Sequence, residues 1–228
     1  MDTRQKEYDR FGPWVTEISD EDPVPPLFAP YVKDEAAPLL SLKIPRKIER
    51  RQANPGMDLY DYLVSAHEDH ILILKRDGSS VSSQRCRYDE IQMVHFVEDL
   101  LDGRLQLLIA DKPLEIPFNS VSGEVMVKLL GLVRERYAGD TTFATDSLSA
   151  AQPNRGLSFY FQGRLSEYAT NSPEFKLCAS QAEVAVGHTE HAGVRRLFFQ
   201  LIGRRLTESL HYSDGRELLI IHHGRKYR

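Results

Sequence analysis

The strongest constraint on the fold is a series of chain reversals between residues 60 and 118. Asp77-Gly78 and Asp102-Gly103 are dipeptides typical of hairpin turns, and His67-Glu-Asp69 forms a further polar break. The residues between these breaks have the period of strands. We therefore expect antiparallel strands joined by hairpins at 60–66, 70–74, 91–97, 105–109 and 114–118.

A helical period follows these strands. Apolar residues recur at three- and four-residue steps from Val121 to Tyr137, Ser120 or Ser122 can supply the N-cap, and Gly139 lies just beyond the end. One face of this helix is apolar, so we expect it to pack its stripe on the sheet.

The rest of the chain predicts a second, smaller module. Residues 139–156 are small and polar, as in a linker. Beyond them we expect strands at 157–161, 175–186, 209–212 and 217–222, and a short amphipathic helix at 194–202. The fold class is α+β, mainly antiparallel β.

The stretch from Gly12 to Pro38 combines six prolines with many large apolar residues. Proline disfavours a long helix or a central strand, and disordered linkers rarely contain so many large apolar groups. We expect an extended arm laid across the folded body, with Trp14 as its anchor. The alternative is a peptide that binds a partner.

The order of elements from Tyr60 to Tyr137 resembles the bacterial pleckstrin-homology-like (PH-like) domains. The most telling stretch is Arg87-Tyr-Asp-Glu-Ile-Gln-Met-Val94, which is similar to the start of a strand in that family. The resemblance implies a curved sheet or partial barrel capped by a C-terminal helix, which binds lipids, peptides or sister subunits. Lipid-binding members carry bases around the first hairpin, whereas 67–70 contains two acids. This difference argues against an inositol-lipid site there.

We therefore divide the chain into four parts. They are an extended arm with a basic segment (1–54), a PH-like domain (55–138), a linker (139–156) and a small α+β module (157–228).

Charge is distributed unevenly along the chain. Residues 1–35 contain nine acids and four bases, and residues 192–228 contain eight bases and three acids. A further segment, 43–51, holds five bases and one acid. Either an anionic partner binds the bases, or the acidic arm folds back on the basic region or docks there in a dimer.

No catalytic or metal-binding motif is evident. His67 and His70, like His188 and His191, have i, i+3 spacing, but neither pair has a further local ligand, so we interpret them as surface loop histidines. Cys86 lies between two arginines, which would favour the thiolate, yet a strand cysteine in that position points inward as a small hydrophobe. We expect no catalytic, cofactor or metal residues.

The segment 194–206 has an apolar stripe flanked by paired arginines. The stripe either packs in the core of the second module or lies at an anionic membrane surface. Nucleic acid is not expected, because the pI is near 6.1. The candidate contacts with a partner or membrane are Trp14, Arg46, Lys47, Arg50, Arg51, Arg195, Arg196, Phe198, Phe199, Arg204 and Arg205.

These observations predict a non-enzymatic binding or scaffold protein without a cofactor, whose ligand is a protein partner or its own copy. A charged N-terminus, two separate cysteines and the lack of a long apolar run indicate the cytoplasm. The alternatives are peripheral attachment to an anionic membrane through 43–51 and 194–206, and an enzyme with a dispersed site.

Overall fold

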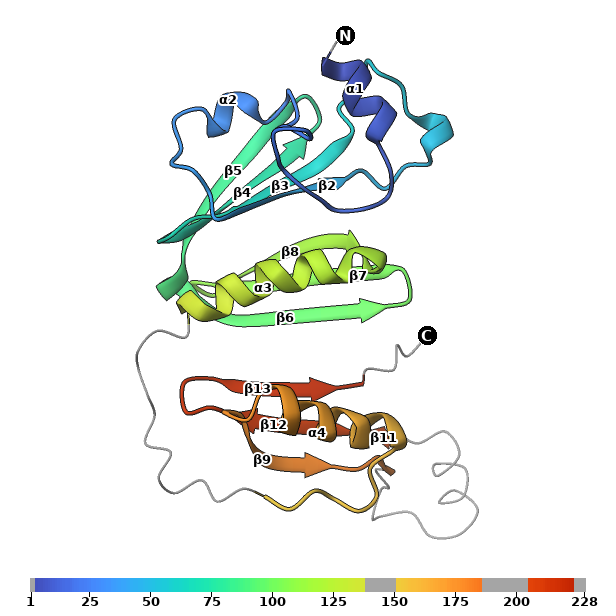
Figure 1. Cartoon of the computed structure of the whole chain (residues 1–228), viewed down its shortest axis with the longest axis vertical. Coiled ribbons are helices and arrows are strands. Elements are labelled where there is room, and N and C mark those ends of the chain that lie inside the picture. Colours follow the sequence, from blue (N-terminus) through green and yellow to red (C-terminus); the bar gives the residue numbers. More distant parts are fainter. Residues whose placement is uncertain (1–2, 138–150, 186–204, 224–228) are drawn as a thin grey trace. The chain divides into compact units, whose positions relative to one another are not determined.

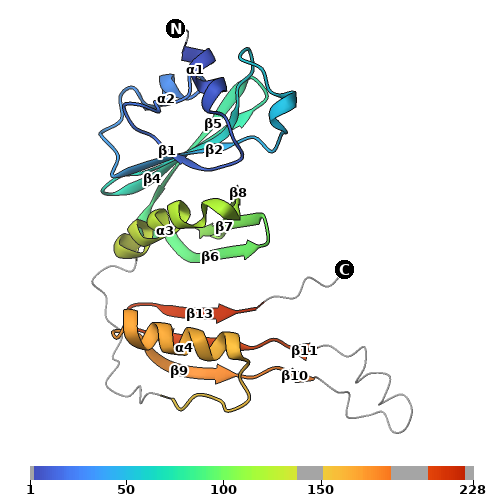
Figure 2. The ribbon, with the colours of Figure 1, turned by 45° about the vertical axis from the view of Figure 1, so that its right-hand side comes forward.

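The computed structural model describes residues 3–137, 151–185 and 205–223 (Figures 1 and 2). The chain forms two compact units, Met1–Gly139 and Asp140–Arg228. Each unit has a hydrophobic core of its own. The predicted α+β class, mainly antiparallel, is confirmed.

The first unit contains two antiparallel sheets followed by a helix. The five-stranded sheet has the order β1 (Thr16–Glu17), β2 (Leu40–Pro45), β3 (Tyr60–Ala66), β4 (His70–Asp77) and β5 (Ser80–Arg87). The three-stranded sheet has the order β6 (Ile91–Asp99), β7 (Asp102–Ile109) and β8 (Lys112–Asn119). The helix α3 (Gly123–Tyr137) closes the unit. Antiparallel strands are thus followed by one closing helix, as the PH-like resemblance implies.

The core of this unit lies between the two sheets and α3. Even-numbered residues 40–44 of β2 and 62–66 of β3 point into it with Ile71 and Ile73 of β4, and α3 adds Met126, Leu129 and Val133. The predicted apolar stripe of α3 is thus confirmed. Val121 precedes the helix and is exposed. Burial of a side chain of the size of Met126 or Leu129 contributes about 1.5–3 kcal/mol to the stability of the fold.

The other face of the five-stranded sheet is covered by the N-terminal arm, residues 3–39. The arm includes α1 (Thr3–Arg10) and α2 (Ala29–Val32), which lie over this sheet in Figure 1. Phe11 and Phe28 are buried there against Leu63 and Leu72. The arm lies on the folded body but contains helices where an extended chain was predicted, and Trp14 is not its anchor, because 52% of its surface is exposed.

Strand β2 begins the long strands of the sheet, before residue 55, where we expected the PH-like domain to start. A buried lysine, Lys43, in its centre and Pro45 at its end hid the strand in the sequence. The first connection between the longer strands of this sheet is therefore that of β2 and β3, residues 46–59, which carries residues 46–51 of the basic segment. The interpretation of 67–70 as the first hairpin is wrong.

The β4–β5 turn lies at its predicted dipeptide, whereas the β6–β7 turn does not. Gly78 has φ +63° in the β4–β5 turn, as predicted from Asp77-Gly78. The β6–β7 turn instead lies at 100–101, and Gly103 stands within β7 opposite Phe118. A Cβ at Gly103 would overlap the Phe118 ring, so this glycine serves close packing and not a reversal.

The second unit contains the helix α4 (Phe159–Asn171) and a sheet of order β13 (Leu218–His222), β12 (Ser209–Ser213), β9 (Lys176–Gln181). A short pair joins β10 (Val184–Ala185) to β11 (Arg205–Leu206). Leu157, Phe161, Leu210 and Tyr212 form its core.

Two of the predictions for this unit differ in how they compare with the structure. The β12–β13 hairpin is confirmed, with Gly215 at φ +89°. The strand expected at 157–161 is wrong, because Phe161 is buried from one face of α4 and Ser158 stands at the N-cap position. The helix expected at 194–202 lies outside the described residues. No helix of the described residues is long and apolar enough to cross a membrane.

Candidate functional site

Most bases of the segment 43–51 are held by the protein itself. Lys43 is 1% exposed, and its Nζ donates to Asp22 Oδ1 at 2.6 Å. Arg50 donates to the backbone oxygens of Phe11 and Asp9, and Arg46 donates to that of Asp58. The N-terminal arm therefore neutralises or occupies much of this segment.

Two exposed bases of the segment have only a surface acid as partner. Lys47 pairs with Asp102 at 2.7 Å, and Arg51 pairs with Glu49. Exposed pairs of this kind contribute only about 0–1 kcal/mol. Lys47 and Arg51 are consequently the two bases of the segment that an external anion could reach at small cost.

The remaining candidate contacts lie in the segment 194–206. Arg205 belongs to β11, where it pairs with Ala185 of β10. The other five residues are outside the described part of the chain: Arg195, Arg196, Phe198, Phe199 and Arg204.

The outer edges of the two sheets in the first unit differ in how they resist another strand. Unpaired edges invite strand addition unless they are short, charged or interrupted by proline. β1 has two residues, β5 carries exposed Arg85 and Arg87, and β8 contains Pro113 and Pro117. β6 has nine residues and no proline, and no described strand pairs with its outer edge.

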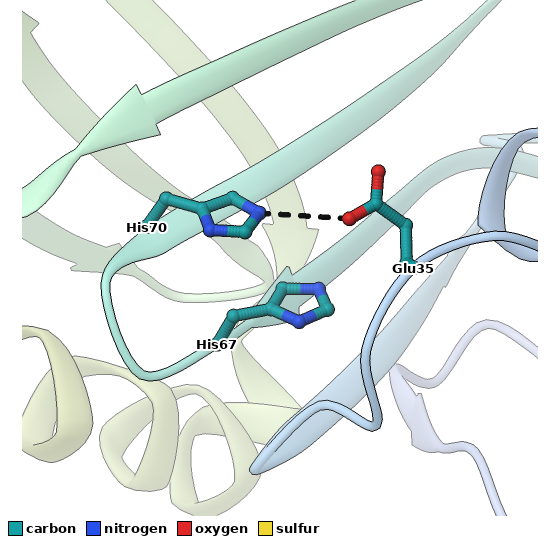
Figure 3. A group of neighbouring side chains, drawn as sticks. All are labelled: Glu35, His67 and His70. Carbon is teal, nitrogen blue, oxygen red and sulfur yellow. Dashed lines mark ion pairs between the residues drawn. The ribbon is translucent and has the colours of Figure 1, made fainter.

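A group of metal-ligating side chains lies where the N-terminal arm meets the β3–β4 turn. Glu35, His67 and His70 each offer one ligand atom, and these three atoms lie within 4.8 Å of one another (Figure 3). His67 and His70 are 3% and 5% exposed. The interpretation of this pair as surface loop histidines is therefore wrong.

The turn itself brings the two imidazoles together. The backbone N–H of His67 donates to the oxygen of His70 at 2.9 Å, so Glu68 and Asp69 form the loop between them. The rings stack with centroids 4.5 Å apart and planes 1° from parallel. Across a two-residue turn, i, i+3 spacing places side chains opposite each other, as cross-strand neighbours.

His70 has two carboxylates near its two nitrogens. Its Nδ1 lies 2.7 Å from Asp69 Oδ1, and its Nε2 lies 3.9 Å from Glu35 Oε2. The hydrogen bond from His70 lowers the pKa of Asp69. Arg85 pairs with the other oxygen of Glu35. Both carboxylates are therefore held as acceptors.

His67 differs from His70 in having no such partners. Neither ring nitrogen makes a hydrogen bond to any described residue. Burial, followed by the neighbouring His70, lowers the pKa of His67, so its ring is neutral. A buried polar group without a partner costs about 1–3 kcal/mol. Sequence reasoning missed this group because Glu35 comes from the arm, far along the chain.

Cys86 is buried in the core of the first unit, beside Ile71 in the sheet register. Burial raises the pKa of its thiol, which opposes thiolate formation. The prediction of an inward-facing, hydrophobe-like cysteine is confirmed.

No protein-family model matches the chain, and no curated protein matches it. A similar solved structure is that of a DUF1696 family protein with a pleckstrin-homology domain from Shewanella loihica PV-4. The match covers 55% of this chain and 99% of that chain, with 12% identity and a TM-score of 0.38.

Proposed function

We propose that this chain is a non-enzymatic binding protein whose first unit docks an extended segment of a protein partner along β6. The observation that carries the proposal is the contrast among the sheet edges. β6 is long, free of proline and has its two acids at its end, whereas β1 is short, β5 carries exposed arginines and β8 is interrupted twice. Strand addition supplies affinity through main-chain hydrogen bonds and specificity through alternating side chains.

The side chains of β6 suit such a contact. Met93 is exposed, and Val94 and Phe96 are partly buried against the core. A docked strand would cover this apolar surface at little conformational cost, because the register of β6 against β7 holds its backbone in place. A second copy of the chain could supply the docked strand as well as a different protein could.

The test begins with the mass of the full chain in solution, measured by light scattering over a concentration series. Random 12-residue peptides are then selected on the protein, and amide shifts map the binding site by NMR. We expect shifts concentrated in β6. Met93→Lys should weaken peptide binding at least tenfold, since lysine on an edge opposes pairing.

Leu100→Lys is the matched control, because it places the same charge on an exposed apolar residue of the β6–β7 turn. This variant should bind as the parent does. Amide shifts confined to another element, or equal losses in both variants, would refute docking at β6. A dimer that Met93→Lys dissociates would identify the partner as a second copy.

Attachment to an anionic membrane is a second candidate, and the position of the basic segment favours it. Residues 46–51 of that segment lie in the β2–β3 connection, the first of the sheet, and lipid-binding members of the resembled family carry bases around their first hairpin. Of its exposed bases, Arg50 is bound to backbone oxygens of the arm, which leaves Lys47 and Arg51, and each base contributes about 1 kcal/mol at an anionic surface. Flotation with anionic vesicles that Lys47→Glu abolishes would favour this candidate over docking at β6.

A further inference from the structure

We propose that Glu35, His67 and His70 bind a divalent transition-metal ion, of which zinc is the best fit, and that the ion fastens the N-terminal arm to the β3–β4 turn. This inference is independent of docking at β6. It rests on the proximity, burial and hydrogen bonding of three side chains (Figure 3).

The first argument is the state of His70. In the neutral tautomer whose Nδ1 donates to Asp69, the lone pair of Nε2 is directed toward Glu35. A histidine that donates one N–H to a carboxylate and presents its other nitrogen to a site has the arrangement seen in metal-bound histidines. Two acceptors, Nε2 and Glu35 Oε2, then face each other at 3.9 Å and call for a cation between them.

The second argument is His67. A proton shared between His70 and Glu35 would satisfy those two residues, yet it would leave both nitrogens of His67 buried without a partner. A metal ion uses a lone pair of each imidazole and an oxygen of the carboxylate together. A metal ion therefore accounts for the convergence of three polar side chains, rather than two, at this place.

The ligand types select the class of ion. Neutral imidazole nitrogens suit zinc and its neighbours, whereas magnesium and calcium prefer oxygen ligands throughout. Two histidines and a carboxylate leave the fourth tetrahedral position of zinc for water. Calcium and magnesium should therefore fail to compete.

Binding requires a local movement. Ligand atoms around tetrahedral zinc lie roughly 3.3 Å apart, which is closer than the 4.8 Å limit of this group. The stacked rings are nearly parallel, so one must turn for both lone pairs to meet at one ion. His67 is the ring that can turn, because no hydrogen bond from a described residue holds it.

The experiment is calorimetric titration of the chelator-treated full chain with zinc chloride, followed by cobalt(II) absorption spectra as a second readout. We expect one site from this group, lost in His67→Ala, His70→Ala and Glu35→Gln. His188 and His191 could bind zinc independently, so the double variant His188→Ala/His191→Ala is titrated as well. It must retain the site formed by Glu35, His67 and His70. Excess calcium and magnesium should leave the titration unchanged.

Two further variants change exposed residues, so that a loss of zinc binding can be separated from a loss of folding. Asp69 and Glu68 both lie at the surface of the turn, and only Asp69 touches a proposed ligand. Asp69→Asn should weaken zinc binding about 10–100-fold, as loss of a supporting carboxylate does. Glu68→Gln should not. Zinc binding that survives His67→Ala, absence of binding in the parent, or equal effects of Asp69→Asn and Glu68→Gln would overturn the proposal.

Discussion

The N-terminal arm meets the five-stranded sheet at two buried polar sites that differ in one respect. At the first site, Lys43 Nζ reaches Asp22 at 2.6 Å and the oxygen of Pro23 at 3.4 Å. At the second site, His67 is equally buried and makes no hydrogen bond to a described residue through its ring. Burial alone therefore does not distinguish a structural contact from a binding site, whereas the supply of partners does.

The Lys43 site is a closed structural contact. Besides its two oxygen partners, the ammonium lies 4.7 Å from the centroid of the Tyr60 ring. Burial, with the charge of Asp22, raises the pKa of Tyr60, so the phenol stays neutral and its ring can face the cation. Every charge in this contact is compensated, which leaves nothing for a ligand to bind.

Breaking the closed contact between Lys43 and Asp22 should have the largest effect on stability. Lys43→Ala leaves Asp22 without its nearest cation and removes a buried stem, so we expect a loss of about 3–5 kcal/mol in the free energy of unfolding. Urea denaturation measures this loss. A change below about 1 kcal/mol would mean that the lysine is not a structural partner of the arm.

Filling the second site, formed by Glu35, His67 and His70 and here called the open site, should have the next largest effect on stability. Zinc at about one hundred times its dissociation constant should raise the free energy of unfolding of the parent by about 2.7 kcal/mol. The same zinc should leave His70→Ala unchanged. Equal stabilisation of both proteins would place the bound ion elsewhere in the chain.

Removing the unpartnered ring without zinc should cost little. His67→Leu replaces two unsatisfied nitrogens with an apolar side chain of similar size, so stability should stay equal or rise by about 1 kcal/mol. Urea denaturation of His67→Leu beside Lys43→Ala compares the free energies of unfolding of the two variants directly. A loss of more than about 2 kcal/mol would show that His67 already has the partners it needs.

The smallest effect concerns pH near the closed contact. Burial raises the pKa of Glu7 in α1 from 4.5 to about 7, although Lys43 partly opposes the change. The folded state thus holds this proton more tightly than the unfolded state, and its contribution to stability is lost as pH rises through about 7.

Glu7→Gln cannot lose that proton, so its melting temperature should fall less than that of the parent between pH 5 and pH 8. Thermal denaturation at both pH values provides the measurement. Parallel falls in the two proteins would assign the pH dependence to other groups.

The sequence predicted the elements that local patterns encode. The hairpin signals and the stripe on α3 are local, and so is Gly78 in its turn. β2 was missed because its central lysine is buried only through Asp22 of the arm. α4 was missed because the aromatic residues at its start favour strands.

The open site could be predicted only in part. The spacing of His67 and His70 across a two-residue break indicates that the two rings face each other. Nothing local indicates Glu35, because its position depends on how Phe11 and Phe28 fix the arm on the sheet. A cluster assembled by tertiary packing leaves no spacing in the sequence.

The most direct test of the contrast between the two sites is anomalous diffraction at the zinc edge from crystals grown with zinc. We predict a peak within bonding distance of His67, His70 and Glu35, with the Lys43 contact unchanged. A peak only at other histidines, or none near the β3–β4 turn, would contradict the metal site and leave the two imidazoles as a purely structural pair.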